Sequence, residues 1–130
     1  MMTSKIAVAC LLTAFLAFQP LAAQPTNTGT GKSDQKNLMK NWALSICFAR
    51  IAQDEQTKKD AGLTARAYLE NSQQDVEDFE KIGKLVDEYI ALNYGGSVQS
   101  EYNTMKCIDL FHSKKLDQLT TTLVKMDRLK

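Results

Sequence analysis

Apolar residues recur at three- and four-residue steps along most of the chain, and this spacing predicts a series of amphipathic helices. The first predicted helix starts at a cap formed by Ser33 or Asp34 and continues to Ile51. Residues 53–59 are charged and polar, so we predict a turn there. A second helix is predicted over residues 60–70.

The third predicted helix starts at a cap formed by Asn71 or Ser72 and has a continuous apolar stripe up to Ile90. Its end is predicted within residues 93–97, because the paired glycines there can adopt the positive φ angles that terminate a helix. The pattern therefore predicts a connection centred on these glycines.

Two more helices are predicted in the C-terminal part of the chain. One starts near Gln99, and its expected apolar stripe comprises Tyr102, Met105, Ile108 and Phe111. After a short break at residues 112–113, the last helix extends over residues 114–129. The sequence shows no convincing alternation of apolar and polar residues, so we predict an all-α fold, a small bundle of about five helices.

The N-terminal segment has the pattern of a secretory signal peptide. Lys5 precedes an apolar run over residues 6–18, which is followed by small residues suited to cleavage near Ala23. The run is too short to span a bilayer as a stable helix. We therefore predict a cleaved signal peptide over residues 1–23, a polar flexible tail over 24–33 and one helical domain over 34–130.

Two of the three cysteines belong to the predicted mature chain. Cys10 lies inside the apolar run of the leader, which argues against a lipid-modified N-terminus. Cys47 and Cys107 form an even pair in an exported protein, and in an oxidising compartment such a pair favours a disulfide. A bond between the first and fourth helices would fix the two halves of the domain side by side.

The mature chain has no net formal charge. The whole chain has 16 basic and 15 acidic residues, and removal of Lys5 with the leader leaves 15 of each. A neutral domain with interspersed charges lacks the electrostatic pattern of a protein that binds nucleic acid or an anionic membrane. We predict neither partner for the mature protein.

The sequence offers few residues for catalysis or for a metal. His112 is the only histidine, and it lies at the predicted helix break, where a capping or interface role is more typical than general-base catalysis. The zinc motifs CxxC and HExxH and the haem motif CxxCH are all absent. We therefore predict a protein that acts by binding, with no catalytic residue, metal or cofactor.

The segment from Asn93 to Val98 has two interpretations. It can be an ordinary connection between helices, which is the usual role of a single Gly-Gly pair. It can also be a protruding loop that enters a cleft of another protein, because small residues allow close backbone approach and a nearby disulfide lowers the entropy cost of presenting the loop. The residue pattern alone leaves both open.

Three separated blocks carry a resemblance to a known family. Residues 41–47 (NWALSIC), residues 60–70 (which begin DAG and end AYLE) and residues 102–113 (YNTMKCIDLFHS) resemble the type VI secretion amidase immunity proteins of the fourth group. The resemblance covers about residues 36 to 120, and the block that ends in KCIDLFHS is the most specific part.

The resemblance implies a periplasmic immunity protein that protects its own cell. Its partner would be a cognate peptidoglycan amidase effector, a cysteine endopeptidase that cuts stem peptides at the D-glutamyl–diaminopimelate bond. The family is helical and dimeric, and its dimer engages two effector molecules, so a homodimer within a heterotetramer is expected here.

The resemblance also assigns a binding loop. In the family, a short Gly-Ser-containing turn after the third long helix enters the effector's catalytic groove, which corresponds here to Gly95, Gly96, Ser97 and Val98. The family turn is Gly-Ser-Ser, so the inserted hydroxyl is assigned to Ser97 within one residue. The residues expected at the rim of the interface are Asn93, Tyr94, Gln99, Glu101 and Tyr102.

A second function class remains as an alternative to the immunity protein. A general periplasmic helical binding or chaperone-like protein, without a dedicated toxin partner, would have the same composition and helical pattern. The neighbouring gene distinguishes the two, because only an immunity protein requires a cell-wall hydrolase encoded beside it.

Overall fold

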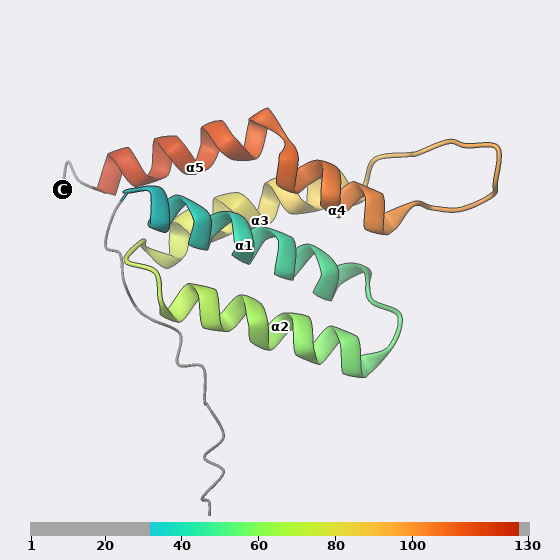
Figure 1. The fold of residues 1–130 in the computed structure, drawn as a ribbon, viewed down its shortest axis with the longest axis horizontal. Helices are drawn as coiled ribbons and strands as arrows, with labels where there is room; N and C mark the ends of the chain where they lie inside the picture. The colour runs from blue at the N-terminus through green and yellow to red at the C-terminus, as the bar shows by residue number, and fades with distance from the viewer. Residues whose placement is uncertain (1–31, 128–130) are drawn as a thin grey trace, which may run out of the picture.

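The computed structural model describes residues 32–127, which fold into five helices with no strand among them (Figure 1). The predicted all-α fold is therefore confirmed. The bounds are α1 (Lys32–Ile51), α2 (Glu55–Glu70), α3 (Val76–Ile90), α4 (Asn103–His112) and α5 (Lys114–Asp127). The predicted signal peptide, the predicted tail up to residue 31 and the last three residues lie outside the described range.

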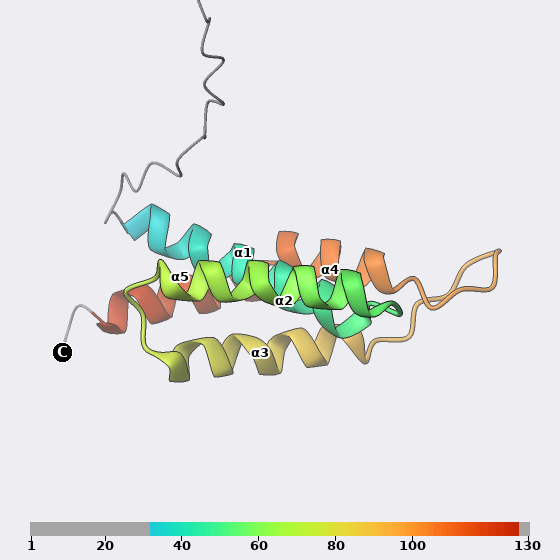
Figure 2. The ribbon, with the colours of Figure 1, turned by 90° about the horizontal axis from the view of Figure 1, so that it is seen from below.

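The α1 helix is the central element of the bundle. It contacts each of the other four helices, whereas α2 packs mainly against α1. In Figures 1 and 2, α2 runs alongside α1, and α4 and α5 follow each other along a different side of it. Because α1 contacts all the other helices, a helix that is bonded to α1 is fixed in position relative to the whole bundle.

The core lies between α1, α3, α4 and α5. At its centre Phe79 is 2% exposed and meets the ring of Trp42 edge-on, with ring centroids 5.2 Å apart. The buried cluster comprises Met39, Ala43, Cys47, Phe79, Ile82, Leu85, Val86, Cys107, Leu110, Leu116, Leu123 and Val124. None of the helices in the described range is long and apolar enough to cross a membrane.

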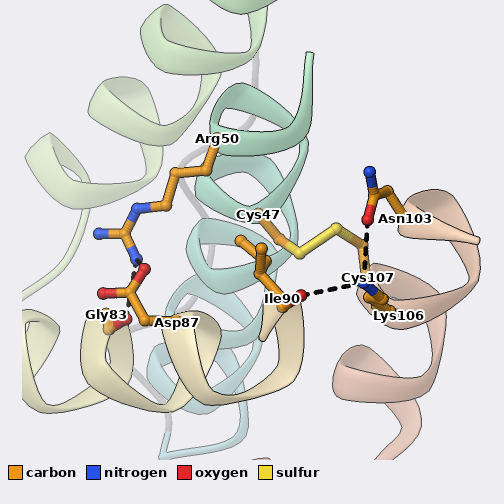
Figure 3. Close-up of a disulfide and its surroundings, with 8 residues drawn as sticks. All are labelled: Cys47, Arg50, Gly83, Asp87, Ile90, Asn103, Lys106 and Cys107. Atoms are coloured by element: carbon orange, nitrogen blue, oxygen red, sulfur yellow. Dashed lines mark hydrogen bonds and ion pairs between the residues drawn. A yellow bond between two sulfur atoms is a disulfide. The ribbon is translucent and has the colours of Figure 1, made fainter. Parts of the chain in front are cut away.

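The predicted disulfide is present and fully buried. Cys47 on α1 and Cys107 on α4 are bonded, with their Cα atoms 5.7 Å apart and neither residue exposed. The bond joins α4 directly to the central helix (Figure 3). It therefore fixes the element that follows the predicted binding loop.

Two local predictions about α2 and α3 were wrong. The predicted turn over residues 53–59 is largely helical, because the Asp54 carboxylate accepts a hydrogen bond from the Thr57 amide and starts α2 at Glu55. This hydrogen bond also lowers the pKa of Asp54. The next predicted caps do not start α3: Asn71 is instead the C-cap of α2 and donates to the Ala67 carbonyl, and the Ser72 hydroxyl donates to Gln35 on α1.

The predicted apolar face of α4 was also wrong. Met105 and Ile108 are 48% and 47% exposed, whereas the buried face contains Lys106, Cys107 and Leu110. The disulfide turns the Cys107 side of α4 toward α1. The expected apolar stripe of α4 therefore lies partly at the surface. A buried lysine on this face is the feature that hydrophobic periodicity could not anticipate.

Candidate functional site

The α3–α4 loop, residues 91–102, is the longest connection in the described part of the chain. It extends beyond the end of the bundle in both views, away from all five helices (Figures 1 and 2). Residues 95–101 are all exposed. The protruding arrangement that the sequence left as one of two interpretations is thus the one observed.

Both boundaries of the α3–α4 loop differ from prediction. The α3 helix ends at Ile90, with Ala91 as a right-handed C-cap, so it stops before the glycines. Neither Gly95 nor Gly96 has a φ in the left-handed range, so the predicted role of these glycines as positive-φ helix terminators was wrong. The loop is consequently longer than the short Gly-Gly turn that the pattern suggested.

The loop ends at Tyr102, whose backbone conformation is unusual for a residue other than glycine. Its φ of 52° places it in the left-handed region, and it stands at the N-cap position of α4. The predicted start of this helix near Gln99 was therefore wrong, because the chain turns at Tyr102 and becomes helical only at Asn103.

The side chain of Tyr102 closes the loop on itself. Its hydroxyl donates a hydrogen bond to the carbonyl of Val98 at 2.7 Å. The ring lies so close to Gly96 that a Cβ there would come within 2.9 Å of the tyrosine Cζ and closer still to its hydroxyl oxygen. Glycine is required at position 96 for this packing, whereas a Cβ at Gly95 would meet nothing within 4 Å.

The other predicted site residues are at the surface of the same loop. Val98 is 68% exposed, more than any other large apolar residue of the described chain. Ser97, Asn93 and Gln99 are also exposed, and Glu101 accepts a hydrogen bond from Asn103. The structure thus brings all the predicted loop and rim residues together in one segment.

Tyr94 connects the first half of the loop to α4. Its hydroxyl donates to the Asp109 carboxylate at 2.7 Å. This hydrogen bond, together with burial and the nearby negative charge, raises the pKa of Tyr94. The contact holds the first half of the loop against α4, the helix that follows it.

Lys106 and Asp109 belong to the site but were not predicted. Lys106 is only 6% exposed, and its Nζ donates to the Ile90 carbonyl and to the Asn103 side-chain oxygen, at 3.0 Å each (Figure 3). Both residues belong to the block over residues 102–113, which is the most specific part of the family resemblance. A lysine beside a disulfide-bonded cysteine, on the buried side of a helix, was the available signal for Lys106.

Two clefts flank the base of the loop. One, of about 500 Å³, is bordered by the ends of α1 and α3 together with residues such as Arg50, Tyr94 and Lys106. The other, of about 750 Å³, is more apolar and includes Ile51, Met105 and Ile108. A partner that receives the loop could therefore also contact these surfaces at its base.

A model of the family described as type VI secretion system (T6SS) amidase immunity protein, Tai4, matches residues 37–120 of this chain. The chain belongs to this family. The predicted family is therefore confirmed. The Tai4 family is an immunity family rather than an enzyme family, so the prediction of a non-enzymatic protein is confirmed as well. A comparison with curated protein sequences gives no match.

Solved structures related to Tai4 have the same fold. A chain of the Tae4/Tai4 effector–immunity system from Salmonella typhimurium is 46% identical, with 66% of this chain and 85% of that chain covered and a TM-score of 0.63. A complex of the effector Tae4 from Salmonella typhimurium with the immunity protein Tai4 from Enterobacter cloacae gives 27% identity, coverage of 78% and 99%, and a TM-score of 0.62.

A third structure comes from a study of type VI-secreted toxins and self-resistance proteins in Serratia marcescens. It is 28% identical over 93% of this chain and 88% of that chain, with a TM-score of 0.64. Two of the three structures are described as pairs of an effector and an immunity protein. An effector protein is therefore the class of partner against which the protruding loop can be tested.

Proposed function

We propose that this protein binds a cognate T6SS peptidoglycan amidase effector and blocks its catalytic groove with residues 95–98, which protects the cell's own wall. One observation carries the proposal: in a chain of the Tai4 family, the α3–α4 loop extends beyond the bundle formed by the described helices, with its central residues exposed (Figures 1 and 2). The description of the relatives as effector–immunity complexes supports the class of partner.

The loop blocks the groove by occupying the place of substrate. Gly95 has open space around it, so its backbone can approach the effector's nucleophilic cysteine closely. Ser97 provides a hydroxyl for hydrogen bonds, and the exposed Val98 side chain provides apolar area at the centre of the contact. Because the mature chain is neutral, shape and buried contact outweigh long-range steering.

The protein acts in the periplasm as a homodimer that engages two effector molecules. The apolar N-terminal run and the disulfide support export to an oxidising compartment. Mass spectrometry of the periplasmic protein tests the leader, with a mature N-terminus near residue 24 expected. Analytical ultracentrifugation with and without the effector tests the dimer, and a monomer that forms only a one-to-one complex would contradict it.

The central experiment combines the purified mature protein with the amidase encoded beside its gene and measures peptidoglycan hydrolysis. At stoichiometric excess the protein should abolish hydrolysis. Undiminished hydrolysis would refute the proposed function.

A pair of glycine variants locates the inhibitory surface. Gly95→Glu places a charged side chain in the loop, and Gly62→Glu places the same side chain on α2 at a position that also has nothing within 4 Å. Both variants should retain the helical circular-dichroism signal. Only Gly95→Glu should lose inhibition, and equal inhibition by the two would show that the loop does not enter the groove.

A further inference from the structure

The two ends of the α3–α4 loop meet at one buried side chain. Lys106 Nζ donates to the carbonyl of Ile90, the last residue of α3, and to the side chain of Asn103, the first residue of α4 (Figure 3). Both distances are 3.0 Å. A single ammonium group therefore fixes the separation of the points where the loop begins and ends.

A lysine in this position is explained poorly by packing alone. Lysine is rarely this deeply buried, because taking its charge out of water is unfavourable, yet Lys106 is only 6% exposed. Its two acceptors here are uncharged oxygens. The Ile90 carbonyl lies at the C-terminus of α3, where the helix dipole favours a positive charge. An apolar side chain could fill the same space without the desolvation penalty, but it could not hold the two loop ends.

The helix that carries Lys106 is itself fixed. The next residue, Cys107, is bonded to Cys47 on the central helix, so the lysine backbone has little freedom to follow the loop. One turn further along α4, Asp109 accepts the hydrogen bond from Tyr94. The α4 helix therefore holds the loop at its two ends and at Tyr94 in its first half.

We infer that Lys106 is a positioning residue that keeps the α3–α4 loop in the conformation used for binding, an inference that rests on the proposed function. Lys106 itself is buried and does not enter the groove. It acts by restricting the loop before the partner arrives, which removes part of the ordering entropy that binding would otherwise have to overcome.

The first test uses the free protein and needs no effector. Lys106→Met keeps the length of the side chain and removes its donors. Hydrogen exchange of the α3–α4 loop, followed at its hydrogen-bonded amides Ala91, Leu92 and Tyr102, should become about tenfold faster, whereas exchange in α1 should change little. Lys106→Arg retains charge and donors and should restore part of the protection. Unchanged loop exchange in folded Lys106→Met would overturn the inference.

Asn103→Ala provides a second route if Lys106→Met does not fold. It removes one acceptor of the same ammonium from a half-buried position and leaves the lysine in place. Asn103 also donates to Glu101, so Glu101→Ala, which removes only that contact, is the matched control and should change loop exchange less. A smaller but measurable increase in loop exchange is expected for Asn103→Ala. If the exchange of the loop is the same as in the wild type, the lysine does not restrain it.

The second test measures binding to the amidase with a control matched for stability. If Lys106→Met lowers the binding-competent fraction of the loop to about a tenth, the apparent Kd rises about tenfold. Leu123→Ala removes a buried side chain from α5 and lowers global stability without touching the loop. Its Kd should equal that of the wild type.

The outcomes separate the inference from the proposed function. An equal loss of affinity in Leu123→Ala would show that Lys106 acts only through stability, and an unchanged Kd in Lys106→Met would show that the restraint is irrelevant to binding. Failure of the wild-type protein to bind the amidase would instead refute the proposed function, and the exchange experiment would still decide whether Lys106 restrains the loop.

Discussion

The interior around the disulfide and the α3–α4 loop are held by different forces, although α4 belongs to both. Around Cys47 and Cys107 the chain is closed by a covalent bond and by apolar side chains that are almost completely buried. The loop is exposed, and its described restraints are polar contacts made by Lys106, Tyr94 and Tyr102.

This difference separates stability from binding. Packing and cross-linking determine the free energy of unfolding, so substitutions in the interior should change stability first. Substitutions in the exposed loop remove little buried area and should change recognition first. The two regions can therefore be tested with matched variants, and the separation fails if the effects cross over.

The largest expected effect is that of removing the disulfide. Replacing Cys47 and Cys107 together by alanine should lower the free energy of unfolding by roughly 4 kcal/mol, because the unfolded chain regains the entropy of the long loop that the bond closes. Urea denaturation of the double variant and the wild type measures the difference. A loss below about 1 kcal/mol would mean that packing alone holds α4 on α1.

The next effect compares an interior residue with a loop residue. Leu110→Ala empties a fully buried site on α4 and should cost about 3 kcal/mol of stability. Val98→Ala removes a 68% exposed side chain and should change stability by less than about 0.5 kcal/mol, yet weaken amidase binding. Thermal unfolding and calorimetric titration measure both quantities, and a stability loss in Val98→Ala would contradict the separation.

A smaller effect distinguishes the two glycines of the loop. Gly96→Ala places a methyl group against the Tyr102 ring and should break the hydrogen bond from the Tyr102 hydroxyl to the Val98 carbonyl. The free energy of unfolding should fall by about 1 kcal/mol. Gly95→Ala is the control, because the same methyl group meets nothing within 4 Å. Near-ultraviolet circular dichroism of the free protein should change only for Gly96→Ala, and an equal change in both variants would place the ring elsewhere.

The smallest effect is a pH dependence at Tyr94. Its pKa is raised in the folded protein by the Asp109 carboxylate, so the contact stabilises the loop below pH 10 and is lost as the pH rises through the folded pKa. Spectrophotometric titration of the tyrosines should show a component above pH 10 that Tyr94→Phe removes. If the component that this variant loses has the ordinary tyrosine pKa near 10, the hydrogen bond is absent in solution.

The interior was predictable from the sequence because its signals are local or compositional. The stripe of α3 contains Phe79, Ile82 and Val86 at helical spacing, and all three are buried. The Cys47–Cys107 pairing followed from the count of cysteines in a chain that is predicted to be exported. Helix α2 was predicted too short because its first residues, Glu55 to Lys59, are all exposed and show no apolar period.

The shape of the loop was not predictable because its determinants are contacts between distant residues. No sequence period reveals that Lys106 reaches Ile90 or that Tyr94 reaches Asp109. The same buried lysine misled the prediction for α4, since it takes a place on the inward face and leaves Met105 exposed. The resemblance located the loop, but the restraints on it required the structure.

The disulfide also makes the chain topologically closed around its most exposed segment. The bond between Cys47 and Cys107 forms a covalent ring, and the α3–α4 loop lies within that ring. A single proteolytic cut in the loop would therefore open the ring without releasing a fragment, and the nicked molecule would differ from the intact one only by the water added at the cut. Only reduction would separate its two halves, so the part of the molecule most accessible to a protease is also the part where one cut removes nothing.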